Sequence, residues 1–121
     1  HIVADVIHQT GLTMRAEREQ ARAFITGRVE YFGKRFGFTY NRIFVKAHRT
    51  KWGSCSHKRN LNFNYRIMYL PQDLADYIVV HELCHLKVMD HSKQFWNLVG
   101  KVIPDYTEHR RGLKKYVFRV E

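Results

Sequence analysis

Residues 74–86, LADYIVVHELCHL, decide the fold of this chain. Their apolar side chains fall on more than one side of a helix, which is typical of a central and buried helix. His81 and His85 are four residues apart, so both imidazoles lie on one face of that helix and can reach the same ion. Glu82 lies one step further round, where its carboxylate can take a proton from a water bound to the ion. The segment therefore predicts a metal site on a buried helix.

A catalytic zinc ion needs a third protein ligand and an open fourth position. His91 follows six residues after His85, and it can turn back towards the pair only if the helix ends near Met89. Asp90 or Ser92 can cap a following helix, so we expect a break at this point. The rival third ligands are Glu108, which ranks second, and His109, Asp90 and Cys55. We expect one Zn²⁺ per chain, because this ligand set makes zinc the default metal.

The same donor set predicts a hydrolytic mechanism. Zinc held by three neutral imidazoles lowers the pKa of its water towards 7 and polarises a scissile carbonyl. Glu82 is expected to accept the proton of that water and to return it to the leaving amine. A developing oxyanion would want another donor. The candidates for this donor are Tyr106, His109, Arg110 and Tyr65, among which the sequence does not choose.

Further helices are expected on both sides of the central one. Residues 13–36 carry apolar side chains at helical spacing, with Thr13 as a candidate N-cap. Gly37 falls where a helix of this length is expected to stop. Near the other end of the chain, one helix is expected from about Ser92 and another after Pro104.

Between these helices the apolar pattern changes to a period of two. Residues 43–48 and 61–68 alternate in this way, which predicts two half-buried strands. Their connection, residues 49–59, is long for a tight hairpin, so we expect a functional or bulged loop there. The predicted fold is α+β and zincin-like, with an N-terminal helix, a small antiparallel sheet, a central helix carrying HExxH and C-terminal helices.

The size and composition of the chain are those of a folded protein. It has 121 residues and no linker-like segment, so we predict a single domain over residues 1–121. The chain starts at His1 rather than Met, and residues 1–12 are a candidate tag or truncated N-terminal remnant. No apolar run reaches the length of a membrane span, and no signal peptide is evident. Cys55 and Cys84 are expected to be reduced thiols, so we expect a cytoplasmic protein with no membrane partner.

Basic residues are unevenly distributed along the chain. The net charge is +10, and residues 31–72 contain nine basic side chains and no acidic one. This asymmetry indicates either a soluble charged surface or an acidic partner, with nucleic acid as the first candidate. The candidate nucleic-acid contacts are Arg49, Lys51, Trp52, Lys58 and Arg59. For the tryptophan, packing against the central helix is the first interpretation and base stacking is the alternative.

Short motifs are spread along residues 14–118. They are KWGSCS at 51–56, LN at 61–62, LP at 70–71, the run 79–86, HS at 91–92, FW at 95–96 and IPDY at 103–106. Together they resemble the YgjP-like metallopeptidase domain, a family related to the SprT-like and WLM zinc peptidases. The resemblance implies a third ligand that is followed by a Phe three or four residues on, which here is His91 with Phe95. The chain departs from the pattern at Lys51, where Arg is common, and at Gly112, where a second Trp is often found.

These observations predict a zinc-dependent metallopeptidase that acts on peptides or proteins. A peptide substrate could add to the edge of the sheet as an extra strand. The alternative is a nucleic-acid-associated zinc protein, either a non-catalytic binding module or, as some SprT-like and WLM relatives are, a protease recruited to DNA. Salt-dependent DNA binding would separate this alternative from a plain peptidase. The sequence leaves the oligomeric state open.

Overall fold

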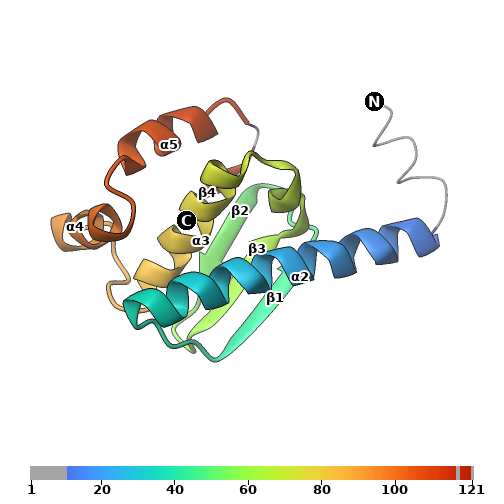
Figure 1. Cartoon of the computed structure of the whole chain (residues 1–121), viewed down its shortest axis with the longest axis horizontal. Coiled ribbons are helices and arrows are strands. Elements are labelled where there is room, and N and C mark those ends of the chain that lie inside the picture. The colour runs from blue at the N-terminus through green and yellow to red at the C-terminus, as the bar shows by residue number, and fades with distance from the viewer. Residues whose placement is uncertain (1–10, 117, 121) are drawn as a thin grey trace.

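The structure is a computed structural model that describes residues 11–116 and 118–120. Most of the segment expected to be a tag or N-terminal remnant, residues 1–10, lies outside the described part. Figure 1 shows one long helix, α2, lying across a small sheet, and two shorter helices, α4 and α5, beyond the central helix α3. None of the described helices is long and apolar enough to cross a membrane.

Helix α2 spans Gly11–Phe36 and supplies part of the core. Ala21, Ile25 and Val29, four residues apart, are fully buried as their helical spacing predicts. Gly37 has a positive φ of 74°, and the Phe38 N–H donates to the Gly33 carbonyl over 3.0 Å. This arrangement ends the helix where a glycine can adopt the left-handed conformation without strain, as expected.

The start of α2 differs from the prediction. Thr13 is the predicted N-cap, but it lies inside the helix, which the structure describes from Gly11 onwards. Helix ends fray, and a single Thr does not determine the boundary when the residues before it can also take up helical dihedrals.

The sheet has four strands in the order β1-β3-β2-β4. Their bounds are Arg42–Lys46 for β1, Lys51–Cys55 for β2, Asn60–Asn64 for β3 and Arg119–Val120 for β4. Strand β1 pairs with β3 in parallel, β2 pairs with β3 antiparallel, and β4 pairs with β2 in parallel. The predicted small antiparallel sheet is correct for the β2–β3 pair only, because β1 and β4 both pair in parallel and the sheet is mixed.

The cause of this error is strand β2, which lies in the segment predicted to be a loop. The chain reverses direction before β2 and again after it, so β1 and β3 run the same way and become parallel neighbours. The predicted strand over residues 61–68 is also too long. It ends at Asn64, whose side chain accepts a hydrogen bond from the Arg66 N–H over 3.1 Å and starts a 3₁₀ helix, η1, over Tyr65–Tyr69.

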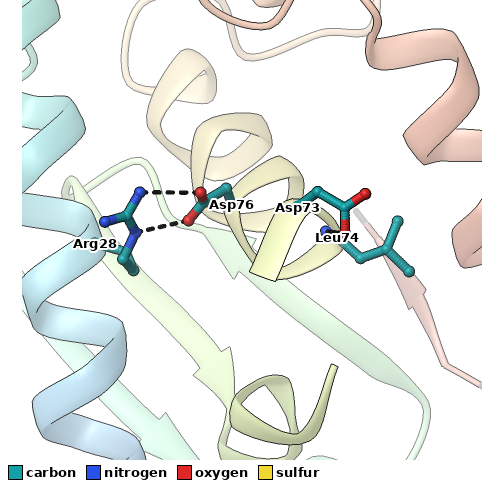
Figure 2. Close-up of polar contacts among 4 residues, drawn as sticks. All are labelled: Arg28, Asp73, Leu74 and Asp76. Carbon is teal, nitrogen blue, oxygen red and sulfur yellow. Dashed lines mark hydrogen bonds and ion pairs between the residues drawn. The ribbon is translucent and has the colours of Figure 1, made fainter. Parts of the chain in front are cut away.

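Helix α3, Gln72–His85, is the centre of the molecule, as predicted. Eleven of its residues are buried, and it contacts α2, β2 and the two following helices, α4 at Lys93–Val102 and α5 at Tyr106–Leu113. Figure 2 shows the ion pair that joins α2 to α3, in which Arg28 donates to both carboxylate oxygens of Asp76 over 2.7 and 2.9 Å. The predicted α+β class, with a central HExxH helix and C-terminal helices, is confirmed.

Candidate metal centre

Three histidine side chains converge at the C-terminal end of α3. Among the described residues, His81, His85 and His91 form the group of ligand atoms that could hold a metal ion. The His85 Nε2 atom lies 3.2 Å from the Nε2 atoms of both His81 and His91, and the last two are 3.3 Å apart. Three nitrogens in a nearly equilateral triangle can bind one ion placed above their centre.

A sharp turn after α3 brings the third histidine back to the pair. The helix ends at His85, four residues earlier than the predicted end near Met89. The N–H groups of Lys87 and Val88 both donate to the Cys84 carbonyl over 3.0 Å, so the chain turns away as soon as the second histidine is placed. The sequence could not show this boundary. A tightened last turn can satisfy the final carbonyl groups of a helix, so no particular residue is needed to mark the end.

The next helix begins where the sequence predicts. The Ser92 hydroxyl accepts a hydrogen bond from the Phe95 N–H over 3.4 Å and caps α4. Asp90, the other candidate cap, accepts instead from the Ser92 N–H over 3.3 Å. The cap fixes the direction of the chain next to His91, whose own side chain stays exposed to solvent.

The outer nitrogens of the two helix histidines also have partners. His85 Nδ1 lies 3.0 Å from the Val88 carbonyl oxygen, which can only accept, so this nitrogen carries the hydrogen and Nε2 keeps its lone pair. His81 Nδ1 lies 3.5 Å from the hydroxyl of Tyr77, which is almost fully buried. Partners of this kind orient metal-binding histidines and select their tautomer. The pattern at 74–86 indicated only that Tyr77 was helical, so its position beside His81 was missed.

Strand β2 passes directly over Glu82, which is fully buried. A methyl group added at Gly53 would lie 2.9 Å from the Asn62 carbonyl oxygen and 3.3 Å from Glu82 Oε2. The strand therefore approaches the carboxylate so closely that only glycine fits. This role of Gly53 was missed from the sequence, although a glycine inside a strand is a known signal of close backbone approach.

Aromatic rings enclose the histidines on the side of α4. Phe95 is fully buried and stacks on the His85 ring with the centroids 4.3 Å apart and the planes inclined by 19°. The Trp96 ring lies 5.8 Å from that of His81 and 6.0 Å from that of His91. These contacts limit the rotation of the imidazoles and leave the exposed side of His91 as the open side of the centre.

The four candidate oxyanion donors are placed differently. Tyr106 stacks on Trp96 at 5.4 Å, and the Arg110 guanidinium lies 4.6 Å from the same ring. His109 instead lies between Asp105 and Asp73, with nitrogen–oxygen distances of 3.2 and 3.5 Å. Tyr65 lies on η1 and contacts the guanidinium groups of Arg66 and Arg18 at 4.6 and 5.8 Å. The structure thus places Tyr106 and Arg110 next to a ring that touches the histidine group.

The rival metal ligands do not join the histidine group in the described structure. Glu108, His109, Asp90 and Cys55 are all outside it. Burial and the nearby Glu82 carboxylate raise the pKa of the Cys55 thiol to about 11, which opposes formation of a thiolate ligand. Both Cys55 and Cys84 are free, in agreement with the expected reduced thiols.

One of the candidate nucleic-acid contacts is buried, and another is engaged within the chain. Trp52 is only 3% exposed, and its ring packs edge-on against Phe118 at 5.0 Å and Tyr116 at 6.2 Å, which favours the packing interpretation. Arg59 donates to the carbonyl groups of Thr39 and Leu86 and so ties the β2–β3 turn to the end of α3. The remaining three are exposed or half-buried: Arg49, Lys51 and Lys58.

One sheet edge that a peptide could use is already partly paired. Strand β4 aligns with Lys51 and Gly53 on the outer side of β2, with an irregularity in register between them. A peptide that added to β2 at these positions would have to replace β4. The expected edge addition therefore competes with a segment of the chain itself.

A buried helix that carries two histidines and a carboxylate, beside a third histidine and under a small sheet, is the arrangement of a metallopeptidase. The sequence matches the YgjP-like metallopeptidase domain over residues 7–116, and the chain belongs to this family. The family resemblance and the enzyme class predicted from the sequence are thereby confirmed. No curated protein matches the chain in sequence.

Solved structures with the same fold include two metallopeptidase zymogens. The metallopeptidase zymogen abylysin of Pyrococcus abyssi has a TM-score of 0.71 and 23% identity, covering 80% of this chain and 99% of its own. The metallopeptidase zymogen jannalysin of Methanocaldococcus jannaschii has a TM-score of 0.64 and 24% identity, covering 75% of this chain and 94% of its own. Because both identities are below 25%, this similarity establishes a shared fold and nothing more specific.

Proposed function

We propose that the chain is a zinc-dependent metallopeptidase in which His81, His85 and His91 bind the ion and Glu82 is the general base. The observation that carries the proposal is the triangle of Nε2 atoms, with sides of 3.2 to 3.3 Å. Zinc–nitrogen bonds of about 2.0–2.1 Å at tetrahedral angles require nitrogens about 3.3–3.4 Å apart. The three donors therefore fit zinc without rearrangement, and three ligands leave a fourth position open.

The surrounding residues support hydrolysis of peptide bonds. Bound zinc supplies Lewis acidity, which lowers the pKa of water and polarises a carbonyl. Glu82 takes a proton from the attacking water and delivers it to the leaving amine. It follows His81 directly in the chain, and its side chain is fully buried beneath Gly53 of β2. Gly53 leaves room for that carboxylate, and the Val88 carbonyl holds His85 in the tautomer that binds metal through Nε2. Of the two candidate oxyanion donors that contact Trp96, Tyr106 is the one without a formal charge.

Metal content and turnover test the two parts of this proposal separately. The parent protein, prepared without a tag, is expected to contain about one zinc per chain, whereas His91→Ala loses most of it. Glu82→Gln is expected to keep the zinc and to lose turnover of a peptide substrate. Retained zinc in His91→Ala together with loss of zinc in Glu108→Ala would instead identify Glu108 as the third ligand. Full activity of Glu82→Gln would end the general-base assignment.

Association with nucleic acid is a second candidate function, supported by the charge of +10 and the acid-free stretch. Arg49 and Lys58 are exposed on that stretch, and neither has a described carboxylate partner. Binding to duplex or single-stranded DNA at low salt, weakening steeply as salt is raised, would support it. Absence of binding at low salt would remove it. The cytoplasmic location expected from the two thiols stays a prediction.

A further inference from the structure

We propose that Arg110 binds a carboxylate of the substrate, so that the enzyme favours peptides with a free C-terminus or an acidic side chain close to the scissile bond. The proposal rests on the proposed function and adds a substrate preference to it. A C-terminal carboxylate and an Asp or Glu side chain present the same chemical group, and the experiment below separates them.

The first observation is the position of Arg110 relative to the metal centre. Its guanidinium carbon lies 4.6 Å from the centroid of the Trp96 ring. The same ring lies 5.8 Å from the ring of His81 and 6.0 Å from the ring of His91. Trp96 therefore contacts both the guanidinium and the rings of two of the proposed ligands.

The second observation concerns the acidic residues around α5. Among the described residues, no carboxylate lies within ion-pair distance of Arg110. Asp73 and Asp105, which belong to the same region between α3 and α5, are both next to His109. Arg110 therefore keeps its charge available for an external anion.

Chemistry makes a carboxylate the fitting partner. A guanidinium presents parallel N–H donors that match the two oxygens of a carboxylate, and such charge-assisted pairs are about twice as strong as neutral hydrogen bonds. Contact with the indole restricts the guanidinium before substrate arrives and contributes a cation–π attraction. A partly ordered arginine loses less conformational freedom on binding than a free one.

The main competing role for Arg110 is stabilisation of the oxyanion. That role would lower kcat for every substrate when the arginine is removed, because the oxyanion forms whatever the peptide carries. Binding a substrate carboxylate instead raises KM, and only for peptides that have the carboxylate. The two roles therefore differ in which kinetic constant and which substrates are affected.

The kinetic test compares Arg110→Gln with Arg111→Gln, a matched control for an exposed neighbour on the same helix. The best-cleaved sequence of a random octapeptide library is made with a free or amidated C-terminus, and with Asp or Asn beside the scissile bond. In Arg110→Gln, KM is expected to rise about tenfold for the carboxylate-bearing peptides, with kcat changed less than about twofold. Equal losses for all four peptides, or no loss for any, would overturn the proposal.

A binding test keeps the proposal separate from the proposed catalytic mechanism. Zinc-loaded Glu82→Gln protein is titrated with acetyl-tetra-alanine, with its amide, and with the amide carrying Asp at the third position. At least one carboxylate probe is expected to bind about tenfold more tightly than the plain amide, and this difference should disappear on adding Arg110→Gln but not Arg111→Gln. Preference for the free acid indicates C-terminal recognition, and preference for the Asp probe indicates recognition of an acidic side chain. Equal affinities for all three probes would overturn the inference even if the protein contains zinc and cleaves peptides.

Discussion

At the scale of single residues, the metal centre depends on close contacts that leave little freedom. Glu82 lies against the backbone of Gly53, and Phe95 stacks on His85 with the ring centroids 4.3 Å apart. A side chain in a well-packed interior responds to the addition of one methyl group. Changes that alter volume here are therefore expected to affect the position of the carboxylate.

Gly53→Ala tests this contact. The new methyl would lie 2.9 Å from the Asn62 carbonyl oxygen and 3.2 Å from Glu82 Cγ, so either the strand or the carboxylate must move. We expect turnover to fall by about 10- to 100-fold because small misplacements of catalytic groups have effects of this size. The free energy of unfolding should fall by about 1–3 kcal/mol, while bound metal is retained.

A matched control for this substitution is Gly27→Ala in α2, where an added methyl meets nothing within 4 Å. Replacing this helical glycine should raise the free energy of unfolding by about 0.5–1 kcal/mol and leave turnover unchanged. Parent-like turnover of Gly53→Ala would show that the carboxylate does not need the space that glycine leaves.

The half-buried thiol of Cys55 predicts a dependence of stability on pH. Burial is the main cause that raises its pKa from 9.0 to about 11. The folded state therefore holds this proton more tightly than the unfolded state, so the stabilisation is complete below pH 9 and is lost as the pH rises towards 11. Urea unfolding at pH 8 to 11 should show the decline, and Cys55→Ser should reduce its slope. An identical slope in the variant would assign the decline to other groups.

At the scale of elements, the central helix and its metal site could be predicted from the sequence because both depend on local patterns. The spacing of His81 and His85 needs only helical periodicity, and Ser92 marks the next helix as an ordinary cap. Strand β2 could not be predicted in the same way. Its sequence KWGSC lacks alternation, and the strand exists because β3 pairs with it and α3 covers it.

The parallel pairing of β1 with β3 has the same explanation. Two alternating segments separated by a supposed loop suggest a hairpin, which is antiparallel. Only the insertion of β2 between them in the chain reverses that expectation. Likewise, Tyr77 and Gly53 acquire their places at the site through contacts between elements, which local periodicity does not contain.

The ion pair between α2 and α3 gives a prediction at this scale. Arg28 donates twice to Asp76, and their side chains are only 24% and 16% exposed, so solvent screens the pair weakly. Asp76→Asn is expected to lower the free energy of unfolding by about 1–2 kcal/mol, because Arg28 would keep its partial burial without a charged partner. Urea unfolding measures the change.

Glu30→Gln on the exposed side of α2 is the control for charge removal and should change stability by less than about 0.5 kcal/mol. A double-mutant cycle with Arg28→Ala then isolates the coupling energy of the pair. A coupling near zero would mean that packing alone holds α2 against α3.

At the scale of the whole molecule, zinc would join parts that the chain connects only through a turn. The proposed ligands come from the end of α3 and from the residue before the Ser92 cap of α4. An ion that binds only the folded arrangement stabilises it by about 2.7 kcal/mol when its free concentration is 100 times the dissociation constant. The melting temperature is therefore expected to rise by several degrees with zinc and to fall with a chelator.

His91→Ala should abolish this dependence of the melting temperature on zinc, whereas Glu82→Gln should keep it. Differential scanning calorimetry at fixed protein concentration and increasing free zinc measures both. A zinc-dependent shift that persists in His91→Ala would contradict the three-histidine assignment, whatever the activity of that variant.

The spacing of the three histidines also bears on how the site is first filled. All of them fall between positions 81 and 91, a stretch of eleven residues. A single short segment therefore carries the complete donor set, with no contribution from distant parts of the chain. Zinc captured by this segment would favour the turn after α3 early in folding, before the following helices have packed. Because the same ligands remain close together in the unfolded chain, binding there would also subtract from the stabilisation that zinc gives the native state.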